Sequence, residues 1–81
     1  MSKGREIMKK WVLEALQALG GQARILDISK KVWESHEQDI RESDDLLFEW
    51  QYEIRWAGSL LRDEGLIRPA SLSPRGIWEL A

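Results

Sequence analysis

The chain contains no cysteine and only one histidine, His36. The missing thiols exclude disulfide bonds and thiolate zinc sites, and they favour a reducing compartment. No apolar run exceeds three residues, which is too short to span a bilayer. The polar segment 1–10 does not resemble a signal peptide. We therefore expect a cytoplasmic protein that uses no membrane, metal or other cofactor.

With 81 residues, the chain is long enough for one domain, 1–81. Hydrophobic residues make up 43% and charged residues 32%, which is typical of a globular protein. Folding at this size buries about 60–65% of the chain's surface, so we expect one modest core.

Charge is distributed unevenly, although the formal net charge is only −2. Residues 1–33 hold seven basic and three acidic groups, whereas residues 34–53 hold eight acidic groups and one arginine. The basic groups of 54–81 are all arginines: Arg55, Arg62, Arg68 and Arg75. Guanidinium groups suit phosphates and guanine edges, so this last segment is a candidate for DNA contact, the alternative being an ordinary solvated surface.

Apolar spacing predicts helices over 5–19 and 26–36. The stripe of the first helix is Met8, Val12, Ala15, Leu16 and Leu19, with Trp11 at its edge. Gly20-Gly21 is expected to end that helix, followed by a turn or a brief strand over 22–24. In the second helix Ile25, Ile28 and Val32 face one way, and Leu26 and Trp33 another.

A third helix is predicted over 49–64, ending at Gly65, after an acidic connector with one short helical turn over 37–48. Its inner stripe is Trp50, Ile54, Ala57 and Leu61. Gly58 in the helix interior indicates close packing or close approach of another group. Strands over 66–68 and 77–80 flank a turn-rich loop. The order of elements predicts a mainly α fold with a small β-hairpin, a winged helix-turn-helix, and a plain three-helix bundle with a hairpin is the alternative.

The C-terminal half carries a family-like pattern. It reads Ile54-Arg-Trp56-Ala57-x-Ser-x-Leu61-x-x-x-Gly65-Leu66, and then Pro74-Arg75-Gly76-x-Trp78-x-Leu80. The chain resembles the N-terminal domain of Mrr-type restriction endonucleases along nearly its whole length. The sequence departs from that family at Gly58, where a longer polar residue is common, and at Ala81, where threonine is usual and a linker would begin.

The resemblance implies a winged helix that binds double-stranded DNA, including modified DNA, and that serves a fused or associated nuclease domain in a restriction system. We expect no enzymatic activity here, because the chain lacks an acidic pair with a nearby lysine on adjacent strands. The candidate DNA-binding residues lie on the outer arc of the third helix and around the wing: Gln51, Tyr52, Arg55, Ser59, Arg62, Arg68, Ser71, Ser73 and Arg75.

Other chemistry-bearing residues have plainer interpretations. His36 has no serine–aspartate partner at motif spacing and is expected at the surface, at a helix end. The acidic residues Asp39, Glu42, Asp44 and Asp45 lack the spacing of a calcium-binding hand. Trp11, Trp56 and Trp78 are expected in the core, with Trp56 and Trp78 packed between the third helix and the wing.

A second function remains open from the sequence. A winged helix can dock proteins, and the acidic 34–53 segment with exposed aromatic residues would then bind another protein or form a homodimer. The acidic net charge favours this reading, whereas the arginines and the family-like pattern favour DNA.

Overall fold

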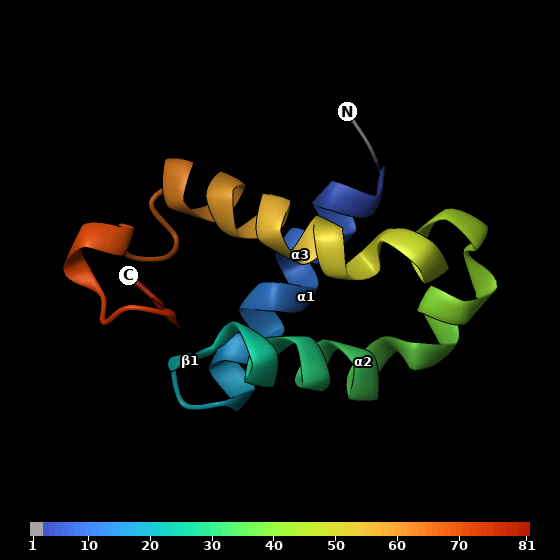
Figure 1. Ribbon diagram of the computed structural model, residues 1–81, viewed down its shortest axis with the longest axis horizontal. Helices are drawn as coiled ribbons and strands as arrows, with labels where there is room; N and C mark the ends of the chain where they lie inside the picture. Colours follow the sequence, from blue (N-terminus) through green and yellow to red (C-terminus); the bar gives the residue numbers. More distant parts are fainter. Residues whose placement is uncertain (1–2) are drawn as a thin grey trace.

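Three helices are followed by a short C-terminal strand that pairs back across the chain (Figure 1). The computed structural model describes residues 3–81. The elements are α1 (Lys3–Ala18), β1 (Gln22–Arg24), α2 (Ile25–Glu42), α3 (Asp44–Asp63), a 3₁₀ turn η1 (Ala70–Leu72) and β2 (Ile77–Glu79). The expected mainly α fold is confirmed, but the two strands are β1 and β2 and not the two strands of the expected C-terminal hairpin.

The core lies between the three helices, where the predicted stripes meet. Met8, Val12 and Leu16 of α1, Ile28 and Val32 of α2, and Ile54, Ala57 and Leu61 of α3 are all buried. Trp11 and Trp78 are buried as well, as expected. Leu19, which was assigned to the first stripe, is 37% exposed because α1 ends at Ala18 and Leu19 lies in the turn that follows.

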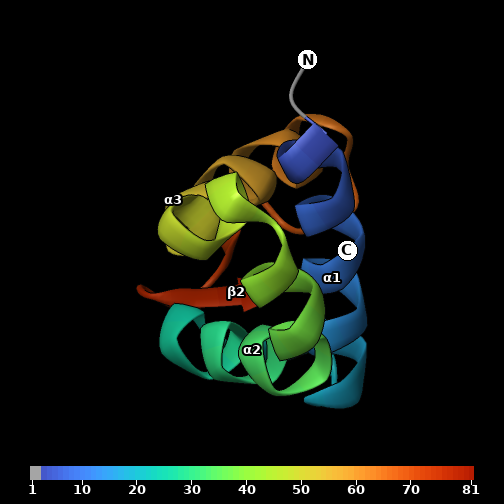
Figure 2. The same cartoon turned by 90° about the vertical axis from the view of Figure 1, so that its right-hand side faces the viewer.

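The sheet differs in pairing from the predicted hairpin. β2 pairs antiparallel with β1, which places Ala23 opposite Trp78. The segment predicted as a strand over 66–68 makes only an isolated bridge, between Ile67 and Leu80. Pro69, which follows directly, has no N–H to donate and ends that pairing. Figure 2 shows β2 passing between the levels of α3 and α2.

The predicted acidic connector over 37–48 is wrong, because nearly all of it is helical. α2 continues to Glu42 beyond a kink at His36, and α3 begins at Asp44 instead of residue 49. Ser43 caps α3, and its side chain accepts a hydrogen bond from the Leu46 N–H at 3.5 Å. Asp44 and Asp45 then lie in the first turn, where carboxylates are favoured by the helix dipole.

The expected burial of Trp56 is also wrong. Trp56 is 41% exposed, and its ring lies 4.4 Å from the Arg5 guanidinium carbon. The ring of Tyr52, one turn earlier, approaches it edge-on at 6.4 Å. Ala57 occupies the core position instead, because a helix turns by about 100° per residue and places neighbours on different sides.

Candidate nucleic-acid interface

The predicted residues of the third helix lie on the solvent-facing side of α3. Gln51, Tyr52, Arg55 and Ser59 are exposed there. Arg62 is half-buried: its Nε donates a hydrogen bond to the Arg68 carbonyl at 3.3 Å, and its guanidinium carbon lies 5.5 Å from the Trp78 ring centre. Arg62 therefore ties the end of α3 to the C-terminal segment as well as facing solvent.

The C-terminal loop forms one end of the molecule (Figure 1), and Arg68, Ser71 and Arg75 are exposed on it. Ser73 is the exception among the predicted contacts. Its hydroxyl is buried and has no hydrogen-bond partner in the part of the chain that the structure describes. Ser73 therefore cannot reach a phosphate without movement of the loop.

The arginines divide into two groups by their partners. The three of the first half are bound to carboxylates, Arg5 to Glu53, Arg24 to Asp27 and Arg41 to Glu37, and Lys9 is bound to Glu6 and Glu64. The hydrogen bond to Glu64 raises the pKa of Lys9. Within residues 3–81, Arg55, Arg62, Arg68 and Arg75 form no ion pair. These four guanidinium groups are therefore free of carboxylates.

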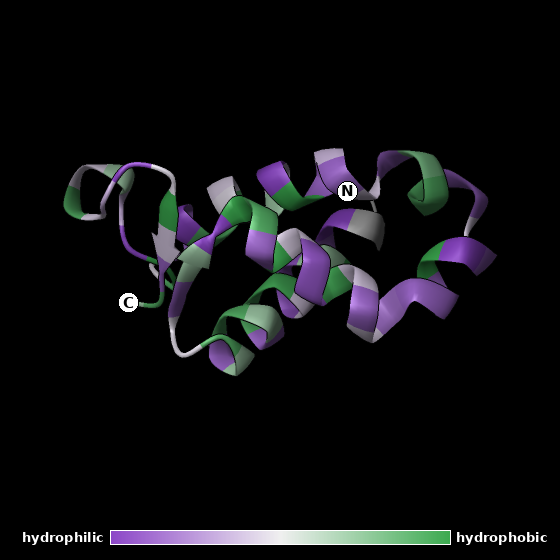
Figure 3. Cartoon of the chain, turned by 60° about the horizontal axis from the view of Figure 1, so that its bottom comes forward, coloured by the Kyte–Doolittle hydropathy of each residue, from purple (hydrophilic) through white to green (hydrophobic). Residues whose placement is uncertain are grey.

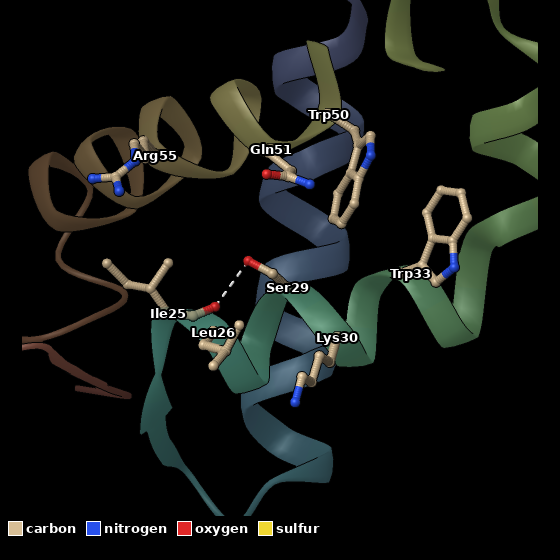
Figure 4. Close-up of a pocket in the computed structure, with 8 residues that line it drawn as sticks. All are labelled: Ile25, Leu26, Ser29, Lys30, Trp33, Trp50, Gln51 and Arg55. Atoms are coloured by element: carbon tan, nitrogen blue, oxygen red, sulfur yellow. Dashed lines mark hydrogen bonds between the residues drawn. The ribbon is translucent and has the colours of Figure 1, made fainter. Parts of the chain in front are cut away.

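A groove of about 680 Å³ separates the first half of α2 from α3 (Figure 4). Its aromatic wall is formed by Trp33 and Trp50, whose rings stack at 5.3 Å between centres. Lys30 of α2 lines it together with Gln51 and Arg55 of α3, and no carboxylate does. Sequence reasoning missed Lys30, because only the packing of α2 against α3 places it beside that helix.

Acidic residues on the first turns of α3 limit the positively charged surface to the second half of that helix and the C-terminal segment. Asp44, Asp45 and Glu49 are exposed on the first turns of α3, whereas Arg55 and Arg62 follow later in the same helix. The molecule measures 36 × 25 × 17 Å, and the acidic corner between α2 and α3 lies at the opposite end of its long axis from the C-terminal loop. Figure 3 shows hydrophilic residues predominating around that corner. A polyanion would therefore contact the second half of α3 and the C-terminal segment.

His36 lies at the kink of α2 rather than at a helix end, and it is half-buried. Its ring stacks on Trp11 at 4.2 Å between centres, and its Nε2 lies 3.2 Å from a Glu14 carboxylate oxygen. This packing is structural. No cluster of three potential metal ligands occurs among the residues described, and no helix there is long and apolar enough to cross a membrane.

No family model, curated protein or solved structure matches this chain. The resemblance to Mrr-type domains therefore rests on the residues quoted for it. What the structure adds is a surface with four unpaired arginines on α3 and the C-terminal segment, and a lysine of α2 beside them.

Proposed function

We propose that the protein is a winged helix that binds duplex DNA, with α2 and α3 as the helix-turn-helix and residues 66–81 as the wing. The order of helices and strands supports this reading. So does the position of β2, which pairs with β1 on one side and with Ile67 on the other. That arrangement attaches the wing to the end of the helical core.

The observation that carries the proposal is the pairing pattern of the arginines. Arg5, Arg24 and Arg41 are bound to carboxylates, whereas the four arginines of α3 and the C-terminal segment have no carboxylate partner among the residues that the structure describes. Phosphate neutralisation by such groups supplies most of the affinity of proteins for DNA. The free arginines all lie on α3 and the wing, the two elements that winged helices apply to a duplex.

Each element has a separate task in this mechanism. α3 enters the major groove, where Gln51 can donate to and accept from an adenine edge and Arg55 can donate to a guanine edge. Arg68 and Arg75 bind phosphates beside it, and Lys30 binds a phosphate on the other side of α3. The phosphate contacts set the position of the domain, and α3 reads the bases.

The proposal extends to the Mrr-like setting: a recognition module without catalytic activity that places a fused or associated nuclease domain on DNA, including modified DNA. The departure at Gly58 fits the packing of this chain. Position 58 faces the Trp78 ring, so a longer side chain has no space there. Base contacts are therefore left to Gln51 and Arg55.

Fluorescence anisotropy with labelled duplexes, plain and methylated, tests the proposal. Three to five phosphate contacts give a slope of log affinity against log salt of about −3 to −4. Arg24→Ala is the matched control, because it removes an exposed arginine that already binds Asp27. A slope near zero, or an equal loss from Arg24→Ala and Arg75→Ala, would contradict the proposal.

One observation favours the alternative, a winged helix that docks protein. Phe48 is 85% exposed at the start of α3, next to acidic residues. A large apolar ring so open to water commonly marks a protein interface. Protein docking at that end of α3 and DNA binding at the other end are compatible, because they use different turns of the helix.

A further inference from the structure

The groove between α2 and α3 has an apolar lining that the proposed DNA contacts do not use. Ile25, Leu26, Trp33 and Trp50 form half of its residues, and Leu26 is 52% exposed. Small-molecule sites typically measure about 300–1,000 Å³ and combine mostly apolar walls with a few polar groups. At about 680 Å³, the groove has the size and the lining of such a site.

The aromatic wall of the groove is held in place by its neighbours. Trp33 and Trp50 stack on one another, and the Arg41 guanidinium carbon lies 5.1 Å from the Trp33 ring centre. Arg41 is held in turn by Glu37, because its Nε donates a hydrogen bond to a carboxylate oxygen at 2.7 Å. Both tryptophans are only half-buried. They therefore offer a preformed apolar surface, on which a planar ring can pack at a low cost of ordering.

The polar groups of the groove select the charge of an occupant. The Ser29 hydroxyl is already used, because it donates a hydrogen bond to the Ile25 carbonyl at 2.8 Å (Figure 4). The other polar residues in the lining are Lys30, Gln51 and Arg55. No carboxylate lines the groove, and neither cation forms an ion pair within residues 3–81. An occupant with a negative charge therefore fits it.

The carboxylate closest in sequence to Lys30 is already bound elsewhere. Asp27 lies one turn earlier in α2 and accepts two hydrogen bonds from Arg24, at 3.0 Å and 3.3 Å. Lys30 thus adds positive charge from the α2 side of the groove, and Arg55 adds it from the α3 side.

We propose that the groove binds a small aromatic carboxylate and that this ligand regulates the contact of α3 with DNA. Figure 4 shows the two indole rings toward one end of the groove and Arg55 toward the other. Trp50 and Arg55 are five residues apart, which corresponds to about 7.5 Å along the helix axis. A bicyclic ring with a short acidic side chain covers this span. Its ring packs against the indoles, and its carboxylate accepts hydrogen bonds from Arg55.

The regulation rests on the proposed function, whereas the binding of the ligand does not. A ligand in the groove engages Arg55 and covers Gln51, the two residues proposed to read bases. The ligand and DNA therefore exclude one another. At ten times its dissociation constant, such a ligand lowers the apparent affinity for DNA about elevenfold.

Nuclear magnetic resonance with 2-naphthylacetate as the probe tests the site without DNA. The chain contains five tryptophans, and substitution of each by phenylalanine assigns its indole N–H signal. The signals of Trp33 and Trp50 should move, with a dissociation constant of about 0.1–1 mM, and those of Trp11, Trp56 and Trp78 should stay. The absence of binding, or equal shifts of all five signals, would overturn the proposal.

Two comparisons test whether charge selects the ligand. The neutral amide 2-naphthylacetamide has nearly the same shape and should bind at least about fivefold more weakly, because it cannot pair with the cations. Arg55→Gln should weaken the binding of 2-naphthylacetate by a similar factor. Arg75→Gln is the matched control, since Arg75 is also an exposed, unpaired arginine but lies on the C-terminal loop. Equal binding of the acid and the amide, or equal losses from the two substitutions, would overturn the assigned ligand class.

Fluorescence anisotropy with a labelled duplex tests the regulation at constant ionic strength. 2-Naphthylacetate at ten times its dissociation constant should lower the affinity for DNA about tenfold, and the amide at the same concentration should lower it much less. A protein that binds the carboxylate but no DNA would refute the proposed function and leave the groove site standing. An affinity for DNA that is unchanged by the bound carboxylate would refute the regulation.

Discussion

The indole ring of Trp78 packs against Gly58, at a point where no side chain has space. A Cβ atom on Gly58 would lie 2.4 Å from Cη2 of Trp78 and 2.7 Å from Cζ2. Trp78 is 5% exposed and lies opposite Ala23 in the sheet, so its ring has little room to move away. The close approach predicted from a glycine inside a helix is thereby confirmed, and it holds β2 against α3.

Replacing Gly58 by alanine should lower the free energy of unfolding. Overpacking costs about 1–3 kcal/mol, whereas alanine returns only about 1 kcal/mol of helix propensity. Urea denaturation measures the difference, and Ser59→Ala, at the exposed neighbouring position, should stay within about 0.5 kcal/mol of wild type. In a Trp78→Leu background the same Gly58→Ala change should become stabilising. A Gly58→Ala protein as stable as wild type would contradict this account.

The arginines of α3 and the wing should differ in their effect on DNA binding. Arg75→Ala should weaken binding equally on all sequences and lower the salt slope by about one, because Arg75 would bind a phosphate. Arg55→Ala should cost about 1–3 kcal/mol on the preferred site and less elsewhere, because Arg55 would read a base. Titration of both variants against a preferred and a scrambled duplex decides between the two roles, and unchanged affinities would exclude α3 as the reading helix.

The ion pair between Arg5 and Glu53 should contribute measurably to stability. Glu53 is 5% exposed, and its Oε2 lies 3.1 Å from the Arg5 Nε. Arg5→Ala leaves this carboxylate without its partner and should cost about 1–3 kcal/mol. Glu53→Gln should recover part of that loss in the Arg5→Ala protein, because an amide is easier to bury than a charge. A double-mutant cycle by urea denaturation measures the coupling, and zero coupling would contradict the prediction.

The pair of Arg24 with Asp27 should make stability depend on pH in the acid range. Two hydrogen bonds from the guanidinium group, at 3.0 Å and 3.3 Å, lower the pKa of Asp27 below its usual 3.8. The stabilisation is therefore present above pH 3.8 and is lost as the pH falls through the lower, folded-state pKa. Thermal melts of wild type and Asp27→Asn should differ near neutral pH and converge in acid. A difference between the two melting temperatures that stays constant from neutral pH into acid would contradict the prediction.

Local patterns in the sequence were sufficient for the existence of the three helices and for much of their inner faces, but not for the second half of α2 or the first turns of α3. The spacing of Met8, Val12 and Leu16 follows from 3.6 residues per turn, and all three are buried as predicted. Gly20 and Gly65 adopt φ values of 92° and 74° where α1 and α3 end, which follows from the freedom of glycine in the left-handed region. The capping of α3 by Ser43 is local too. It was not predicted, because the acidic composition of 37–48 indicated a connector.

The position of Trp56, the partner of β2 and the neighbours of each cation were decided only by tertiary structure. Trp56 lies one residue before the buried Ala57. The position of α1 decides that the Trp56 ring lies outside the core, beside Arg5. β2 pairs with β1, more than fifty residues earlier, because pairing between distant segments depends on how the helices bring them together. Composition gives the number of charges but not which of them meet. The sequence alone therefore indicated three helices, whereas only the packing of the chain determined which arginines have no carboxylate partner.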